Sequence, residues 1–200
     1  MIEILMATYN GENFIKAQLD SIMSQDYTDF LLTIRDDGSK DGTLKIIRSF
    51  MKKYPEKIRL IEDEPTKYNS TKSNFTKLLA NATDSSYYCL CCQDDIWKYN
   101  KLSKQLTMMK QMEAMSGNRT PILVHSDMEL IDLNGEVLRS SYVKYANINP
   151  AKFTLKRMMV ENCIVGLSCM FNAPLLKISK NIPDNAVSHD WWIGLYATAI

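Results

Sequence analysis

The chain has 200 residues, of which 46% are hydrophobic and 24% are charged, and its 24 basic residues nearly balance 23 acidic ones. This length and composition suit one globular domain with a sizeable core. A net charge of +1 excludes a global electrostatic field that would recruit nucleic acid or an anionic membrane. Any partner must therefore be recognised by a local site.

The N-terminus, the apolar runs and the cysteines indicate the compartment in which the protein functions. The first stretch, MIEILMATYN, lacks a basic segment and a small-residue cleavage site, so it does not look like a secretion signal. No apolar run approaches the roughly 20 residues that span a bilayer. Three of the five cysteines crowd one predicted strand, which suits a reducing cytoplasm better than a disulfide framework. We therefore expect a cytoplasmic protein.

Short apolar runs alternate with amphipathic stretches through the first half of the chain. The runs predict strands, and apolar residues at helical spacing predict a helix after each of the first three. This alternation predicts an α/β fold, a mainly parallel sheet with helices on both faces. The predicted strands are residues 2–7, 30–35, 58–61, 87–92 and 122–124, and the predicted helices contain Leu19, Ile47 and Leu78.

The pattern changes in the second half. Asn134-Gly135 is a tight-turn signal between apolar residues, which predicts a small β-hairpin inserted into the α/β domain. A further strand is expected over residues 168–172, followed by a helix with Pro174 near its start. The final HDWWIGLYATAI begins an apolar helix without an end signal, so we expect the natural protein to continue. No repeat or linker divides the sequence, and residues 1–200 are expected to form one domain.

Polar residues follow three of the predicted strands directly. In open α/β sheets, ligands bind outside the carboxyl ends of the strands, so these residues are expected to converge on one crevice. Several carboxylates without a matching basic cluster would repel an anionic ligand unless a divalent cation lies between them. Mg²⁺ and Mn²⁺ accept carboxylates together with phosphate oxygens. The three segments are ATYNG at 7–11, DDGS at 36–39 and QDD at 93–95.

Each of these signals also has an ordinary structural explanation. Asp94 and Asp95 could cap a helix predicted in IWKYNKLSKQL, and DDGS is common in turns. No P-loop or dinucleotide-type glycine loop is present, so phosphate would be held mainly by the metal. The cysteines of this strand form no CxxC pair, and alternation places Cys92 on the face opposite Cys91. We expect core thiols rather than a zinc site.

A further carboxylate, Asp190, precedes two tryptophans in SHDWWIG. It could be a helix N-cap. A carboxylate partly walled by aromatic side chains also suits a general base that takes a proton from a hydroxyl. Trp191 and Trp192 would then wall the pocket or pack into the core. His125 and His189 are the only histidines, and they form no evident ligand pair or triad.

At this point the sequence resembles a known family, the family 2 inverting glycosyltransferases of the GT-A fold. The likeness covers nearly the whole chain. Within the family, the sequence is most similar to the bacterial rhamnosyltransferase-like branch that builds surface polysaccharides. It implies a GT-A (Rossmann-like) sheet, Mg²⁺ or Mn²⁺ as cofactor, a UDP- or dTDP-sugar donor, and a saccharide or lipid-linked acceptor. The segments that carry it are ILMATYNGENFIKAQLDSIMSQDYTDFLLTIRDDGSKDGTLKII, NFTKLL, QDDIW, HSDMELIDLNGEV, NCIVGLSCMFN and HDWW.

The resemblance also implies roles for single residues. Asp95, in the family's DxD-type motif, would bind the metal, and Asp94 would face the sugar or ribose hydroxyls. Asp190 would be the catalytic base, which deprotonates the acceptor hydroxyl for attack on the anomeric carbon with inversion. The other candidates would surround the donor: Ala7, Thr8, Tyr9 and Asp37 at the base and ribose, with Lys72 and Asn74 nearby.

Two positions depart from the family pattern. Family members often have Asp where this chain has Cys92, which weakens the metal signature. They also have Asn-x-Gly where this chain has Asn69-Ser70-Thr71, in the loop on the donor side.

Two other functions are alternatives. A sugar-1-phosphate nucleotidyltransferase should have a Gly/Arg/Lys-rich loop after the first strand, which ATYNGENF lacks. A non-catalytic nucleotide-sugar or carbohydrate-binding module would function without Asp95 or Asp190. The expected C-terminal continuation would contribute acceptor binding or peripheral attachment to the inner face of the cell membrane.

Overall fold

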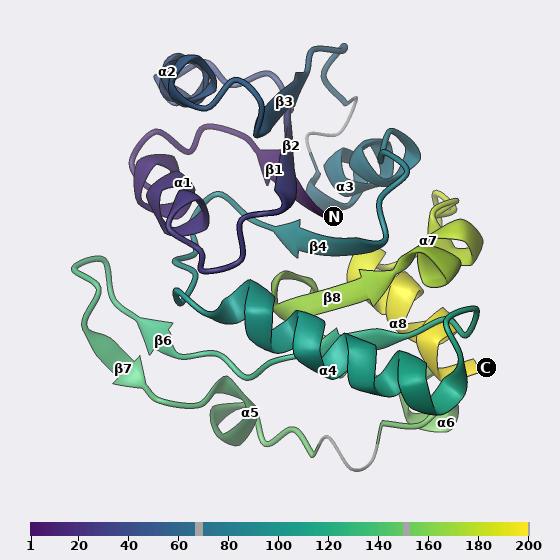
Figure 1. Ribbon diagram of the computed structural model, residues 1–200. Helices are drawn as coiled ribbons and strands as arrows, with labels where there is room; N and C mark the ends of the chain where they lie inside the picture. Colours follow the sequence, from purple (N-terminus) through teal and green to yellow (C-terminus); the bar gives the residue numbers. More distant parts are fainter. Residues whose placement is uncertain (67–69, 150–152, 200) are drawn as a thin grey trace.

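The computed structural model describes residues 1–66, 70–149 and 153–199. The central sheet contains β1 (Ile2–Thr8), β2 (Phe30–Asp36), β3 (Ile58–Ile61), β4 (Tyr87–Cys91), β5 (Leu123–His125) and β8 (Cys169–Asn172). Its strand order is β3-β2-β1-β4-β8-β5 (Figure 1). The first four of these strands are mutually parallel, and β8 is antiparallel to both of its neighbours. The predicted mainly parallel sheet is confirmed.

Helices cover both faces of this sheet (Figure 1). One face packs against α1 (Ile15–Met23), α2 (Thr43–Lys53) and α4 (Lys101–Ser116). The other face packs against α3 (Thr71–Ala80), α7 (Ala173–Ser179) and α8 (His189–Ala199). Two single-turn helices, α5 (Tyr142–Tyr145) and α6 (Leu155–Met158), lie in the second half. Within the described ranges, no helix has both the length and the apolar character needed to cross a membrane.

The first strand shows how the sequence builds both layers. Ile4 and Met6 belong to the core on the α1 side, whereas Leu5 and Ala7 belong to the core on the α3 side. Because both faces are covered, the strand reads as a continuous apolar run rather than an alternating one. Glu3 is the exception, and its buried carboxylate accepts hydrogen bonds from two threonine hydroxyls, as a buried charge requires.

The predicted hairpin lies outside the central sheet, where β6 (Leu130–Ile131) pairs with β7 (Val137–Arg139) (Figure 1). Gly135 has a φ of 84°, a conformation that glycine adopts without steric cost. The Asp132 carboxylate accepts the backbone N–H of Asn134 at 2.8 Å. The turn chemistry predicted from Asn-Gly is confirmed.

The strand expected at residues 168–172 starts one residue later, because Ser168 belongs to the 3₁₀ turn Gly166–Ser168. Pro174 lies in the first turn of α7, as expected. The Asn172 side chain caps this helix by accepting the backbone N–H of Leu175.

Candidate active site

The carboxyl ends of the parallel strands meet at one edge of the sheet. Thr8 at the end of β1 lies opposite Asp36 at the end of β2, and Met6 lies opposite Cys91 at the end of β4. The antiparallel β8 contributes its amino end, so the 3₁₀ turn 166–168 that precedes it lies at the same edge. The segments after these strands are therefore close in space.

Gln93 ties the end of β1 to the QDD segment. Its Oε1 accepts the backbone N–H of Tyr9 at 2.9 Å, and its Nε2 donates to the Tyr9 carbonyl at 2.9 Å. Gly11 permits this approach, since a Cβ at that position would lie 2.3 Å from Gln93 Oε1. The backbone N–H of Asn10 donates to Ser39 Oγ at 2.8 Å, which joins the DDGS segment. The predicted convergence of the three segments is confirmed.

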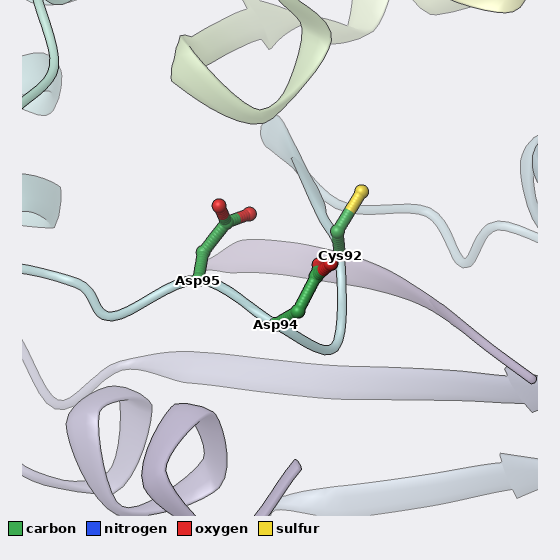
Figure 2. Close-up of side chains that lie close together, drawn as sticks. All are labelled: Cys92, Asp94 and Asp95. Atoms are coloured by element: carbon green, nitrogen blue, oxygen red, sulfur yellow. The ribbon is translucent and has the colours of Figure 1, made fainter. Parts of the chain in front are cut away.

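Asp94 and Asp95 lie in an irregular segment between β4 and α4 (Figure 2). Because α4 begins only at Lys101, the interpretation that these carboxylates cap it is wrong. Asp95 is half-buried, and its Oδ2 is enclosed without a hydrogen-bond partner among the described residues. Burial, followed by the neighbouring Asp94 charge, raises the pKa of Asp95 to about 6.

This carboxylate pair fits a divalent cation. An enclosed carboxylate oxygen without a partner costs free energy, and a cation beside it removes that cost. Two adjacent carboxylates are also the donor set with which Mg²⁺ or Mn²⁺ is commonly bound, alongside phosphate oxygens.

Asp190 lies in the first turn of α8, where four donors hold its carboxylate. Its Oδ1 accepts hydrogen bonds from Ser188 Oγ at 2.6 Å, the Trp191 N–H at 2.8 Å and Asn162 Nδ2 at 3.3 Å. Its Oδ2 accepts one, from the Gly166 N–H at 3.1 Å. A Cβ on Gly166 would lie 2.9 Å from the Asp190 Cβ, so glycine is needed for this close approach. One oxygen of Asp190 is thus saturated and the other is not.

The N-cap residue of α8 is Ser188 rather than Asp190. The Ser188 carbonyl accepts the backbone N–H of Trp192, which places Ser188 at the N-cap position, so the interpretation of Asp190 as the N-cap is wrong. The indole N–H groups of Trp191 and Trp192 donate to the last carbonyls of α6 and α7. Of the two expectations for the tryptophans, packing is the one the structure shows.

Cys92 lies beside the carboxylate pair. The cysteines of this strand were expected to be core thiols, and for Cys92 this is wrong, because it is partly exposed whereas the other four cysteines are buried. Burial raises the pKa of Cys92 to about 12, and the charges of Asp95, Asp94 and Asp190 add to this effect. Because carboxylates from both segments act on one thiol, Asp190 and the QDD pair lie near each other at the edge of the sheet where the crevice was expected.

A fully buried arginine holds Asp37 at the end of β2. Arg35 donates to Asp37 at 3.1 Å, to Asn74 Oδ1 at 2.9 Å and to Asp63 at 2.8 Å. Asp37 also accepts the N–H and hydroxyl of Thr66. Although burial raises the pKa of Asp37, the hydrogen bonds from Thr66 and Arg35 outweigh it and leave the pKa below its ordinary value. Sequence reasoning missed Arg35, whose signal is an arginine inside an apolar strand directly before two aspartates.

The candidates at the end of β1 differ in their exposure. Ala7 packs into the core on the α3 side. Thr8 is buried, and its carbonyl accepts the Nδ2 of Asn74 at 3.2 Å. Asn74 is also buried. Ala7, Thr8 and Asn74 therefore lie beneath the surface at this edge of the sheet. The Tyr9 ring is 37% exposed and is the member of this set that solvent or a ligand reaches.

Lys72 lies on α3, and its ammonium donates to the carbonyls of Asp184 and Ala186. It therefore joins α3 to the segment that leads into Asp190. In the loop that departs from the family pattern, Asn69 lies outside the described residues. The hydroxyl of Ser70 accepts the backbone N–H of Ser73 at 3.2 Å and so caps α3.

A separate hollow of about 500 Å³ opens beside α2 and the end of β3. Its wall includes the exposed ion pair of Arg48 and Glu62, 2.9 Å apart, a type of pair that contributes little. The hollow borders Asp36, but the carboxylates of the crevice do not line it. The oriented carboxylate of Asp190 and the unpartnered oxygen of Asp95 lie outside this hollow.

Comparisons with known proteins identify the family of the chain. Residues 3–158 match the family described as Glycosyl transferase family 2. The dTDP-rhamnosyl transferase RfbG of Shigella flexneri is 28% identical over 196 residues, covering 96% of this chain and 64% of that protein. The UDP-Glc:alpha-D-GlcNAc-diphosphoundecaprenol beta-1,3-glucosyltransferase WfgD of Escherichia coli is 25% identical over 170 residues, covering 85% of this chain and 58% of that protein. The chain thus spans less than two thirds of the length of these relatives.

Solved structures show the same fold. The mannosyltransferase PcManGT from Pyrobaculum calidifontis, in complex with GDP-Man and Mn²⁺, gives a TM-score of 0.69 at 20% identity, covering 95% of this chain and 49% of that one. S. aureus TarS 1-349 gives a TM-score of 0.67 at 16% identity, covering 98% and 55%. The predicted GT-A fold is confirmed. Because the family match covers most of its length, this chain belongs to glycosyl transferase family 2.

Proposed function

We propose that this chain is the catalytic domain of an inverting glycosyltransferase. It moves a sugar from a UDP- or dTDP-sugar to a hydroxyl of a saccharide or lipid-linked acceptor, in bacterial cell-surface polysaccharide synthesis. The observation that carries this proposal is the position of Cys92, on which the charges of Asp190 and of both QDD carboxylates act. The names of the two relatives, a dTDP-rhamnosyl transferase and a glucosyltransferase for UDP-Glc and a diphosphoundecaprenol-linked GlcNAc, support the choice of donor and acceptor classes.

The carboxylates Asp94 and Asp95 form the donor-diphosphate end of the site. We assign Mg²⁺ or Mn²⁺ to Asp95, supported by its unpartnered Oδ2, and the sugar or ribose hydroxyls to the exposed Asp94. The metal supplies positive charge that stabilises the departing diphosphate. Tyr9 and Asp37 hold the base and ribose, while the buried Asn74 fixes the backbone at the end of β1. Ala7 and Thr8 support the end of β1 from the core side, and Lys72 ties α3 to the segment that leads into Asp190.

Asp190 acts as the general base. Its Oδ2 accepts one hydrogen bond and its Oδ1 accepts three, so Oδ2 has the capacity to take the proton of the acceptor hydroxyl. The freed oxygen attacks the anomeric carbon on the face opposite the departing diphosphate. The anomeric configuration therefore inverts, and no covalent enzyme intermediate forms.

We further place the activity in the cytoplasm, at the inner face of the cell membrane where the acceptor is lipid-linked. The five free cysteines support a reducing compartment. The balanced net charge of +1 gives no support for a nucleic-acid partner.

A transfer assay tests the proposal. The chain is incubated with UDP-glucose or dTDP-rhamnose, Mn²⁺ and a saccharide-diphosphate lipid, and nucleoside diphosphate release and the anomeric configuration of the product are measured. Asp190→Asn should lower turnover by about 10²- to 10⁴-fold, as loss of a general base does, and should retain donor binding. Asp184→Asn, an exposed carboxylate before the same helix, is the matched control and should keep full turnover.

Three results would contradict the proposal. Near-normal transfer by Asp190→Asn would remove its role as the base. A product that retains the donor configuration would exclude the inverting mechanism. Synthesis of a nucleotide sugar from a sugar 1-phosphate would instead identify a nucleotidyltransferase.

A further inference from the structure

We infer that Cys92 is a third ligand of the metal site, beside Asp95 and one oxygen of Asp94 whose other oxygen faces the donor hydroxyls, and that the site therefore favours thiophilic cations such as Cd²⁺, Zn²⁺ and Co²⁺ over Mg²⁺. The inference rests on the proposed function, because it adds a ligand to the metal site assigned to Asp95. At position 92 this chain has cysteine, where the family resemblance leads one to expect aspartate.

The first support is the geometry of the segment after β4. The Cys92 Sγ and one carboxylate oxygen each from Asp94 and Asp95 all lie within 4.8 Å of one another. Figure 2 shows the three side chains on one loop, with those of Cys92 and Asp95 extending toward the same side. Ligands at the usual metal distances in a tetrahedral site are about 3.3 to 3.8 Å apart, so small side-chain rotations bring these atoms onto one ion.

The second support is the strand alternation that sets the direction of Cys92. Cys89 and Cys91 belong to the core on the α1 side, whereas Cys92 packs at the margin of the core on the opposite face. Among the five cysteines, Cys92 is the partly exposed one. A cation that enters the crevice therefore meets this thiol and no other.

The third support is the unsatisfied charge beside the thiol. Asp95 Oδ2 is enclosed and has no partner in the described part of the chain. The nearby cation Lys101 does not supply one, because its ammonium donates to the Leu167 carbonyl at 2.6 Å and lies 4.3 Å from the centroid of the Trp97 ring. Lys101 therefore does not neutralise the negative charge of the two carboxylates, and a cation held by these carboxylates and a sulfur would neutralise it.

The chemistry of the donor set decides which cation this is. Oxygen ligands alone suit Mg²⁺, whereas a thiolate selects softer ions. When the ion binds, a sulfur–metal bond forms and the thiol proton passes to solvent. Oxygens of the nucleoside diphosphate complete the coordination. Serine or aspartate at this position would leave an all-oxygen site.

Metal titrations of the 200-residue chain in the presence of UDP test the inference. Co²⁺ should produce a near-ultraviolet thiolate-to-cobalt charge-transfer band, and Cd²⁺ should bind more tightly than Mg²⁺. Loss of an outer partner of a metal ligand already lowers affinity about 10- to 100-fold, so Cys92→Ser should lower Cd²⁺ affinity at least about tenfold and abolish the band. Mg²⁺ affinity should change little. Circular dichroism checks that each variant is folded.

Two variants separate the possible outcomes. Cys163→Ser, a buried cysteine outside the cluster, should keep the band, and Asp95→Asn should lose binding of all the metals. If Co²⁺ binds without the band, or Cys92→Ser keeps its Cd²⁺ affinity, the inference is overturned while the Asp95 site stands. If no metal binds the unmodified chain even with UDP, the metal site of the proposed function falls together with the inference.

Discussion

Two aspartates of the crevice are held in opposite ways. Asp190 is oriented by four donors from separate segments, whereas one oxygen of Asp95 is left without a partner in the described residues. The first arrangement suits the directed proton transfer that we propose for Asp190, and the second suits the cation that we propose for Asp95. In this proposal, environment gives the same residue type two roles.

His189, next to Asp190, makes the fold sensitive to acid. Its ring is buried and stacks on Phe75 with centroids 4.1 Å apart. Burial lowers the pKa of His189 from 6.5 to about 4, although the Asp190 charge opposes the shift. Between these values the unfolded chain binds a proton that the folded chain does not. The contribution of His189 to the free energy of unfolding should therefore fall by about 2 kcal/mol between about pH 7 and pH 5, and the raised pKa of Asp95 opposes this fall.

Urea unfolding of the unmodified chain and of His189→Asn at the two pH values measures this contribution, because the difference between their pH dependences should be about 2 kcal/mol. His125 is the matched control, because burial also lowers its pKa but by less, so His125→Asn should change the pH dependence by less. Equal pH dependence in the unmodified chain and in His189→Asn would show that another group is responsible.

At the scale of elements, the 3₁₀ turn 166–168 connects α4 to Asp190, the proposed catalytic base. Lys101 and Gln105 on α4 each donate to a carbonyl of this turn, at 2.6 Å in both cases. The Gly166 N–H of the same turn donates to Asp190. A helix on one face of the sheet thereby positions a carboxylate carried by a helix on the other.

Lys101→Met should weaken this connection, although Gln105 keeps its own hydrogen bond to the turn. The Leu167 carbonyl then loses its donor, which costs about 1 to 3 kcal/mol of stability, and the turn fixes Asp190 less firmly. A displacement of this kind lowers turnover by up to about 10²-fold, so kcat should fall while the affinity for UDP is unchanged. Lys104→Met makes the same change at an exposed position of the same helix and should leave kcat intact. An unchanged kcat in Lys101→Met would refute the positioning role.

Most strands and helices were predictable because each buries a continuous apolar face. The segment before α4 was not, because Ile96 and Trp97 suggest an earlier helix start. Trp97 instead packs into the core on the α1 side while its backbone stays irregular. The helices α5 and α6 have four residues each, too few for a periodic pattern to indicate them.

The site was predictable in part for a related reason. Residues directly after parallel strands share one edge of the sheet, so the position of the QDD segment beside Tyr9 followed from the topology. Arg35, Asn162 and Gly166 act through contacts between segments distant in the sequence. No local pattern records such contacts, and these residues were missed.

At the scale of the whole molecule, the residues of the proposed site lie at one edge of the central sheet. The sheet is enclosed by a helical layer on each face, and the residues we assign to donor, metal and base lie in segments beyond its strand ends. A buried sheet with irregular segments at its edge is a common way to hold reactive groups in a fixed geometry. The account therefore depends on these segments forming one site.

Calorimetric titration of UDP and dTDP, with Mn²⁺ and with a chelator, tests that claim most directly. The account predicts binding that requires Mn²⁺, is lost in Asp95→Asn and is retained in Asp190→Asn. Binding that is equally strong with the chelator, or an unchanged Mn²⁺-dependent affinity in Asp95→Asn, would contradict it.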